Sequence, residues 1–180
     1  MGIIISSFPG CGKTYLENTN RGKVKILVAD SFAPNGDNIV KEYADFVMEH
    51  VGEYDIVFIS SEEDILEEFN ERNIDYDLFY PSKERRKEFL ENYVRKRVKS
   101  TDIMKLDRDF DKNIDRFDAI EADNCYKHKM EEQGHFIGND AAIMQYINNV
   151  ELNNKKNEQK PSEGVEESPR GEENNETGEA

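Results

Sequence analysis

A run of isoleucines that leads into a glycine-rich turn is the feature that most restricts how this chain can fold. Residues 3–5 are all isoleucine, and after two serines the sequence continues FPGCGKT over residues 8–14. An unbroken run of β-branched residues favours a strand buried on both faces. Gly10 and Gly12 permit backbone angles that other residues rarely adopt, and a helix can begin at Lys13. A strand, a tight turn and a helix in this order are typical of proteins that alternate strands with helices.

Apolar strands and amphipathic helices alternate over the first 150 residues. Residues 24–30 (VKILVAD) and 54–60 (YDIVFIS) predict buried strands, and residues 75–81 predict a shorter one. Residues 38–51 and 62–72 carry apolar side chains at helical spacing. This alternation predicts an α/β fold of three layers, α/β/α, around a mostly parallel sheet of about five strands. Ligands of such folds bind beyond the carboxyl ends of the strands.

The turn matches the phosphate-loop pattern from Ser7 to Thr14, with serine in place of the first glycine. Its glycines let successive backbone N–H groups point at phosphate oxygens, Lys13 can reach the β and γ phosphates, and Thr14 can offer a hydroxyl to Mg²⁺. The alternative interpretation is a strand-to-helix turn with a solvated lysine. The preceding strand and the following helix favour the phosphate loop. The predicted nucleotide-binding residues are Pro9, Gly10, Cys11, Gly12, Lys13 and Thr14.

Charge and composition limit the partners of this chain. Its 180 residues carry a net charge of −15, which disfavours binding to a nucleic acid duplex. No segment is long and apolar enough to predict a membrane span. Two cysteines without a secretion signal favour a reducing cytoplasm, which would be the host cytoplasm if a phage encodes the chain.

The composition changes sharply near residue 151. Residues 151–180 are dominated by Asn, Glu, Gly, Ser and Pro and carry nine acids and four bases. They contain too few apolar side chains to offset the entropy of ordering them. We predict one folded domain over residues 1–150 and a disordered acidic tail over residues 151–180. The tail is a candidate contact for a protein partner.

A basic segment over residues 82–100 stands out in this acidic chain, with eight Lys and Arg against three Glu. Interpreted as one helix, it places Arg86 and Arg97 on its inward-facing apolar stripe. Inward arginines favour contact with the phosphates of a ligand. A solvated basic face is the alternative interpretation. The predicted apolar stripe consists of Phe89, Leu90, Tyr93 and Val94.

These motifs resemble the P-loop nucleoside monophosphate kinase group, which includes adenylate kinase, and most closely its small phage-type members. The resemblance is carried by FPGCGKTYL, by LVADS at the end of the second predicted strand, and by YDIVFIS with YPSKERRKEFLENYVRKR after it. It implies a P-loop NTPase fold, ATP and Mg²⁺ as cofactors, and an arginine-bearing lid over residues 82–100. Carried over by position, Lys13 would stabilise the migrating phosphoryl group, and Arg86 and Arg97 would belong to the lid.

Two departures from that group keep a second function open. Ser60 and Ser61 end the third predicted strand, where P-loop proteins usually carry an aspartate that holds the water of magnesium, and the segment Asp-Gly-x-Pro-Arg is absent. Asp30, at the end of the second strand, could bind magnesium with Thr14 or orient an acceptor hydroxyl; a turn cap is its alternative role. The expected function is transfer of the γ-phosphate of ATP to a nucleoside monophosphate or similar small acceptor. A nucleotide-binding interaction protein without kinase activity is the alternative.

Overall fold

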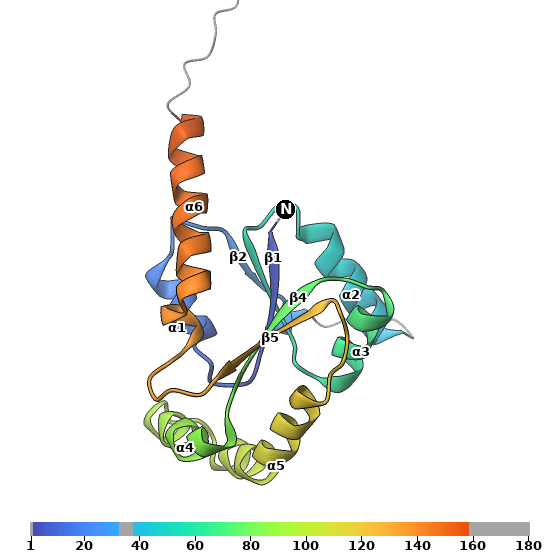
Figure 1. The fold of residues 1–180 in the computed structure, drawn as a ribbon, viewed down its shortest axis with the longest axis vertical. Helices are drawn as coiled ribbons and strands as arrows, with labels where there is room; N and C mark the ends of the chain where they lie inside the picture. The colour runs from blue at the N-terminus through green and yellow to red at the C-terminus, as the bar shows by residue number, and fades with distance from the viewer. Residues whose placement is uncertain (1, 33–37, 159–180) are drawn as a thin grey trace, which may run out of the picture.

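A computed structural model describes residues 2–32 and 38–158, and this part of the chain contains one five-stranded sheet (Figure 1). All neighbouring strands are parallel, in the order β2-β3-β1-β4-β5. The predictions of an α/β fold and of a mostly parallel sheet of about five strands are therefore confirmed. The strands are β1 (Ile3–Ser7), β2 (Ile26–Val28), β3 (Ile56–Ile59), β4 (Tyr76–Pro81) and β5 (Cys125–Met130).

Helices flank the sheet, with α1 and α6 on one side of it and α2 and α3 on the other in Figure 1. This arrangement is compatible with the predicted three layers. The helices are α1 (Lys13–Thr19), α2 (Ile39–His50), α3 (Glu63–Glu71), α4 (Arg86–Arg95), α5 (Ser100–Asp118) and α6 (Ala141–Glu158). Short 3₁₀ segments are η1 (Ala29–Ser31), η2 (Lys83–Arg85) and η3 (Ile137–Asn139).

The strand order places the loop after β1 where ligands of such sheets bind. β1 is the middle strand, with β3 on one side and β4 on the other. From β1 the chain passes through α1 to β2, and after β3 it crosses β1 to reach β4. In open α/β sheets, ligands bind outside the carboxyl ends of the strands at such a reversal of direction. The glycine-rich loop over residues 8–12 leaves the sheet at this reversal.

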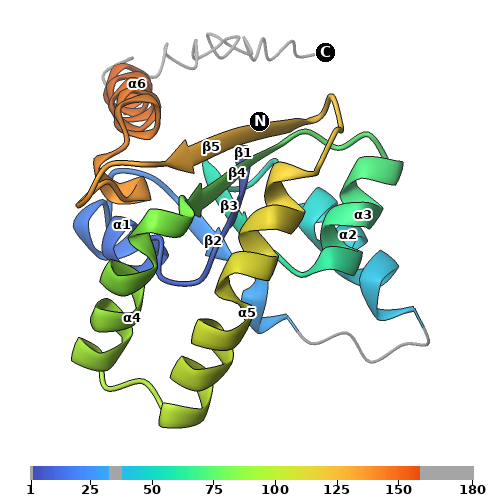
Figure 2. The same cartoon turned by 60° about the horizontal axis from the view of Figure 1, so that its bottom comes forward.

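A cluster of buried phenylalanines joins this loop to α4 and α5, which lie side by side as a hairpin (Figure 2). The ring of Phe8 lies 5.0 Å from the ring of Phe110 and 5.9 Å from that of Phe89, measured between centroids. Phe117 packs edge-on against the same ring. All four side chains are buried, and large aromatic rings contribute strongly to a core. Because Phe8 directly follows β1, these contacts fix the hairpin beside the loop.

The basic segment over residues 82–100 does not form the single helix that we expected. η2 precedes α4, and α4 ends at Arg95. The N–H of Arg97 donates to the carbonyl of Val94 (3.0 Å) and the N–H of Val98 to that of Tyr93 (3.3 Å), which is the Schellman pattern of a helix end. Arg97 therefore adopts a φ of 55°, at a position where glycine is usual. The sequence carries no glycine there, so nothing in it marked the end of the helix.

Replacing Arg97 with glycine is expected to stabilise the fold. A side chain is strained in the left-handed region that Arg97 occupies, whereas glycine enters it freely. We expect a gain of about 0.5–1 kcal/mol in the free energy of unfolding, measured by urea denaturation. The matched control is Arg95→Gly, which places glycine inside the last turn of α4 and should destabilise by a similar amount. Destabilisation by Arg97→Gly would show that the arginine side chain itself supports the turn.

The last helix extends past the predicted end of the folded part. α6 continues to Glu158, eight residues beyond Val150, although residues 152–156 are exposed. Lys155 pairs with Glu151 one turn earlier, at 2.6 Å. The rest of the predicted acidic tail, residues 159–180, lies outside the described residues. None of the helices over residues 2–32 and 38–158 has the length and apolar character needed to cross a membrane.

Candidate functional site

The loop after β1 has two glycines in the left-handed region and, among the described residues, a run of backbone N–H groups without partners. Gly10 and Gly12 adopt φ angles of 90° and 104°, which side chains disfavour. Within residues 2–32 and 38–158, nothing accepts a hydrogen bond from the backbone N–H groups of Gly12, Lys13 or Thr14. Successive N–H groups without partners form the concave nest that binds phosphate in many proteins. The geometry is therefore that expected from the predicted phosphate loop.

Two neighbouring segments pack closely against the glycines of this loop. A Cβ on Gly10 would lie 2.8 Å from the ring of Tyr93 in α4, and a Cβ on Gly12 would lie 3.4 Å from Phe136. The backbone N–H of Ile137 donates to the carbonyl of Cys11 at 3.0 Å. The loop is thus held between α4 and the segment that joins β5 to α6.

Cys11 is a structural member of the loop. Its side chain is buried, and its Sγ lies 3.7 Å from the carbonyl oxygen of Phe79 in β4. Burial raises the pKa of the Cys11 thiol well above its usual range, although the positive charges of Arg85 and Lys13 oppose this rise. The thiol is therefore neutral and contributes packing, while the backbone of Cys11 shapes the loop.

Lys13 and Asp30 meet at the loop. Lys13 begins α1, and Asp30 lies in η1, directly after β2. The lysine Nζ forms an ion pair with the carboxylate, so that Asp30 lies beside the glycine-rich loop. The pair is only partly buried, so an anionic ligand can reach it and compete with the carboxylate.

Of the two predicted magnesium ligands, Thr14 follows Lys13 in α1, and Asp30 pairs with Lys13. Thr14 is exposed next to Lys13, and among the described residues its hydroxyl has no hydrogen-bond partner. Ser60, which follows β3, uses its Oγ to accept a hydrogen bond from the N–H of Glu62 at 3.2 Å. Ser60 therefore shapes the loop that leads to α3. Asp30 remains the carboxylate nearest to the loop lysine.

A cleft of about 690 Å³ adjoins the start of the loop. Its walls combine apolar rings with charged side chains, and acids and bases are equal in number there. Such balance contrasts with the net charge of −15 on the whole chain. The cleft is lined by Phe8 and Pro9 from the loop after β1, by Ser61, Glu62 and Glu63 after β3, by Tyr93 of α4 and by one side of α5.

The bases of the cleft come from α5 and were missed by the sequence analysis. Lys105, Arg108, Lys112 and Arg116 recur every three or four residues, so that they share one side of the helix, which we call the basic face of α5. Six acids within the same helix hide this pattern in the sequence. Three ion pairs hold acids of its other sides: Arg86 with Asp107, Lys83 with Asp115, and Lys129 with Asp118. Asp102 and Asp109 also line the cleft, and Asp109 pairs with Arg108 at 2.8 Å.

Arg116 is the most constrained of these bases. Its Nη2 donates to the carbonyl of Ser61 at 2.7 Å, and its Nη1 lies 3.8 Å from the carboxylate of Glu63. Its Nε is buried and has no partner among the described residues. A buried donor without a partner is costly, and such groups occur at ligand sites more readily than in a core. Arg116 therefore ties α5 to the loop after β3 at the floor of the cleft.

Neither of the two arginines predicted for a lid lines the cleft. Arg86 donates from Nε to the carboxylate of Asp107 at 2.9 Å, and its Nη1 lies 3.4 Å from Asp111. Arg97 is exposed in the turn that follows α4. The expectation that both lie on an inward-facing stripe of one helix is wrong, because α4 ends before Arg97. A contact between Arg86 and a phosphate would require its release from α5.

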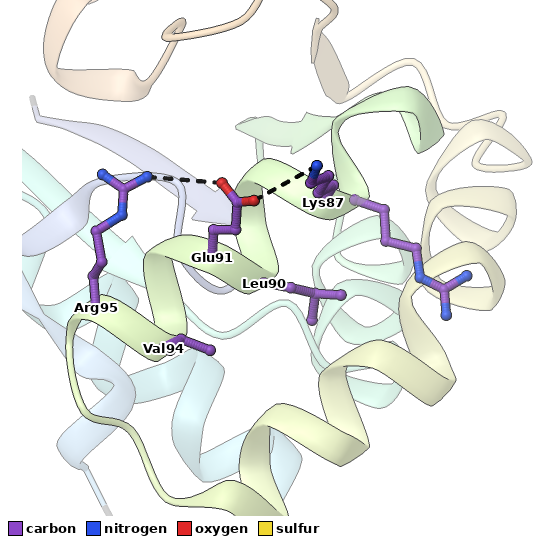
Figure 3. Close-up of a pocket in the computed structure, with 6 residues that line it drawn as sticks. Lys87, Leu90, Glu91, Val94 and Arg95 are labelled. Atoms are coloured by element: carbon purple, nitrogen blue, oxygen red, sulfur yellow. Dashed lines mark ion pairs between the residues drawn. The ribbon is translucent and has the colours of Figure 1, made fainter.

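A second hollow lies on the outer face of α4, and the ion pairs between its charged residues are weak and exposed. Figure 3 shows Glu91 between Lys87 and Arg95, with Leu90 and Val94 beside it. Both ion pairs of Glu91 are 3.9 Å long and exposed, so they contribute little. Val94 is 61% exposed, so its place in the predicted apolar stripe is wrong. Phe89 and Tyr93 are the α4 side chains that reach the glycine-rich loop.

Comparison with known proteins adds no family to this description. No protein-family model matches the chain, and no curated protein is significantly similar to it in sequence. The fold and the site define a parallel α/β protein with a glycine-rich, lysine-bearing loop at the carboxyl edge of its sheet.

Proposed function

We propose that this protein is a P-loop, ATP-dependent phosphotransferase that acts on a nucleoside monophosphate or a similar small acceptor. One observation carries the proposal: the loop with unpartnered N–H groups borders a cleft that it shares with the basic face of α5. Phosphoryl transfer requires mainly positioning and positive charge from a protein. A phosphate loop next to a cleft that carries four bases, in a chain of net charge −15, supports binding of a second phosphate-bearing molecule beside ATP.

The chemical step uses the residues of the loop and the cleft. The bond between the γ-phosphorus and its bridging oxygen breaks and leaves ADP, while an acceptor oxygen forms a new bond to the same phosphorus. Lys13 and the loop N–H groups would hold the phosphates of ATP, and Arg116 would balance charge on the phosphoryl group while it moves to the acceptor. If the acceptor is a hydroxyl, Asp30 is placed to accept its proton once ATP has taken over Lys13.

The residues present are compatible with magnesium at the loop. The unpartnered hydroxyl of Thr14 and the carboxylate of Asp30 are oxygen donors of the kind that Mg²⁺ prefers. When bound, the ion would neutralise charge on the phosphates. Asp30 would then exchange Lys13 for the ion and its waters, a change that needs only side-chain movement in a partly exposed pair.

A nucleotide-binding interaction protein is the second candidate. Two observations favour it: Asp30 neutralises Lys13, and Ser60 at the end of β3 supplies no carboxylate. In that case ATP would stabilise the fold, and a partner protein would contact other surfaces. The predicted acidic tail is one such surface, although residues 159–180 lie outside the described residues. Both candidates are consistent with the expected cytoplasmic location.

A coupled ADP-release assay across a panel of nucleoside monophosphates tests the proposal. We expect ADP release that depends on Mg²⁺ and on one acceptor or a small group of acceptors. The matched measurement is the melting temperature with and without ATP. Stabilisation by ATP without release in the presence of any acceptor would favour the interaction protein. No stabilisation and no release would reject both candidates.

A further inference from the structure

A buried arginine links the two segments that press on the glycine-rich loop. Arg85 ends η2, next to Arg86 in the sequence, and only 2% of it is exposed. Its Cζ lies 5.2 Å from the ring centre of Phe89 and 5.0 Å from that of Phe136. An arginine over aromatic rings is attracted to them, and more strongly where water is excluded. Arg85 therefore contacts α4 and the β5–α6 segment at the same time.

Each of these two phenylalanines also lies next to one left-handed glycine of the loop: the ring of Phe89 next to Gly10, and the Cβ of Phe136 next to Gly12. A Cβ on Gly10 would lie 3.2 Å from Phe89, and a Cβ on Gly12 would lie 3.4 Å from Phe136. The loop is thus confined by two phenylalanine residues, and the Arg85 guanidinium lies against the rings of both. A shift of either phenylalanine would open room at a glycine whose backbone angle sets the direction of the loop N–H groups.

Hydrogen bonds from Arg85 fix the same β5–α6 segment. Its Nη1 donates to the carbonyl of His135 at 2.7 Å and lies 3.4 Å from that of Met130. Its Nε donates to Glu88 at 2.9 Å, and Glu88 accepts the N–H of Gly134 at 3.0 Å. The segment is therefore attached at three points before Phe136. Guanidinium can do this because its donors form a rigid fork.

Stability alone does not account for this arrangement. The Nη2 of Arg85 is buried and has no partner among the described residues. Buried ion pairs are weak contributors to stability, and apolar residues of similar volume often replace them without loss. A buried charge with one donor unsatisfied is costly, which favours a role for Arg85 beyond packing.

We propose that Arg85 is a positioning residue that braces the glycine-rich loop in its anion-binding shape. It acts through Phe89 and Phe136 on Gly10 and Gly12, and it does not touch the ligand itself. Loss of the brace should loosen the loop while leaving the sheet and its other loops intact. The effect on ATP rests on the proposed function, whereas the effect on the loop does not.

The test measures loop opening through the two buried cysteines. Cys11 lies in the loop and Cys125 in β5, so alkylation by iodoacetamide, followed by peptide mass spectrometry, reports the loop against an internal reference. For Arg85→Met we expect the alkylation rate of Cys11, divided by that of Cys125, to rise at least tenfold. Removing the charge of Arg85 would by itself raise the pKa of Cys11 and slow its reaction, so faster alkylation must come from opening.

Two further variants make the test specific. Phe136→Ala removes the ring that Arg85 contacts, and it keeps both the Cβ next to Gly12 and the pair of Arg85 with Glu88. Because the ring no longer holds the β5–α6 segment against Arg85, this variant should also speed the alkylation of Cys11, and it carries the test if Arg85→Met fails to fold. Arg95→Met, which removes an exposed charge from the end of α4, should leave the ratio unchanged. An unchanged ratio in Phe136→Ala and Arg85→Met, or an equal rise at both cysteines, would overturn the brace.

ATP affinity provides the second readout. We expect Arg85→Met to weaken ATP binding about tenfold, with partial rescue in Arg85→Lys, which keeps the charge but cannot form the same fork. If the parent protein binds no ATP, the proposed function fails, and the alkylation ratio still decides whether Arg85 braces the loop. Unchanged ATP affinity in a variant with an opened loop would overturn the link between brace and ligand.

Discussion

Replacing Lys13 with alanine is expected to remove ATP binding while leaving the fold unchanged. The lysine side chain is partly exposed and pairs with Asp30, so it contributes charge to a ligand site and little to the core. At an ATP concentration 100 times its dissociation constant, binding should stabilise the parent protein by about 2.7 kcal/mol. For a domain of this size, that corresponds to a rise of roughly 5–10 °C in melting temperature. The Lys13→Ala variant should show no such rise, and its turnover should fall at least about 10²-fold.

Asp30→Asn is the informative companion of this variant. It removes the carboxylate that competes with phosphate for Lys13, so ATP binding should be kept or become tighter. Turnover should nevertheless fall if Asp30 orients an acceptor or holds the water of magnesium. A variant at position 13 that ATP protects as well as it protects the parent would show that the loop is a strand-to-helix turn and holds no phosphate.

The fold was predictable because apolar periodicity and local turn chemistry agree along the first 81 residues. β3 and β4 lie within the predicted ranges 54–60 and 75–81, and β2 within 24–30. Gly10 and Gly12 adopt the left-handed angles for which glycine is required. Strand order was not predictable in the same way, because it depends on contacts between segments far apart in the chain. The end of α4 was missed because Arg97 takes a position that glycine normally marks.

The loop residues of the candidate site were predictable from the sequence, whereas the bases that α5 contributes to the cleft were not. Lys13 and Asp30 carry local signals, a phosphate-loop motif and a strand-end carboxylate, and the structure brings them together. Arg116 carries no local signal, because acids surround the bases of α5 and the segment is acidic overall. The packing of α5 against α4, β4 and η2 directs Asp107, Asp115 and Asp118 to neighbouring bases, whereas Asp102 and Asp109 stay in the cleft beside the basic face. Composition drew attention to residues 82–100, whereas three-dimensional packing places the bases of the cleft on the next helix.

Replacing Arg116 is expected to reduce turnover far more than it weakens ATP binding. Arg116 lies at the cleft, ties α5 to Ser61 and keeps one buried donor unpartnered. If that positive charge balances the phosphoryl group only during transfer, its loss affects the transition state and spares the ground state. We expect Arg116→Met to lower turnover by about 10²-fold, with a dissociation constant for ATP within a few-fold of the parent value. Arg116→Lys should remain impaired, because a point charge cannot reproduce the guanidinium contacts.

Turnover of variants at Arg86, Arg97 and Arg95 shows whether the catalytic arginine lies in the predicted lid over residues 82–100 or on α5. Arg86 is held by Asp107 and Asp111, so Arg86→Met should loosen the α4–α5 hairpin and lower the melting temperature, with a smaller loss of turnover than Arg116→Met. Arg97→Met and the exposed control Arg95→Met should leave turnover close to that of the parent. A larger loss at Arg86 than at Arg116 would instead mean that the hairpin rearranges when ATP binds and delivers Arg86 to the phosphates, as the lid of the kinase group would. Equal, mild effects at all four positions would leave the cleft without a catalytic charge, and the interaction protein would then be the better account of the ATP site.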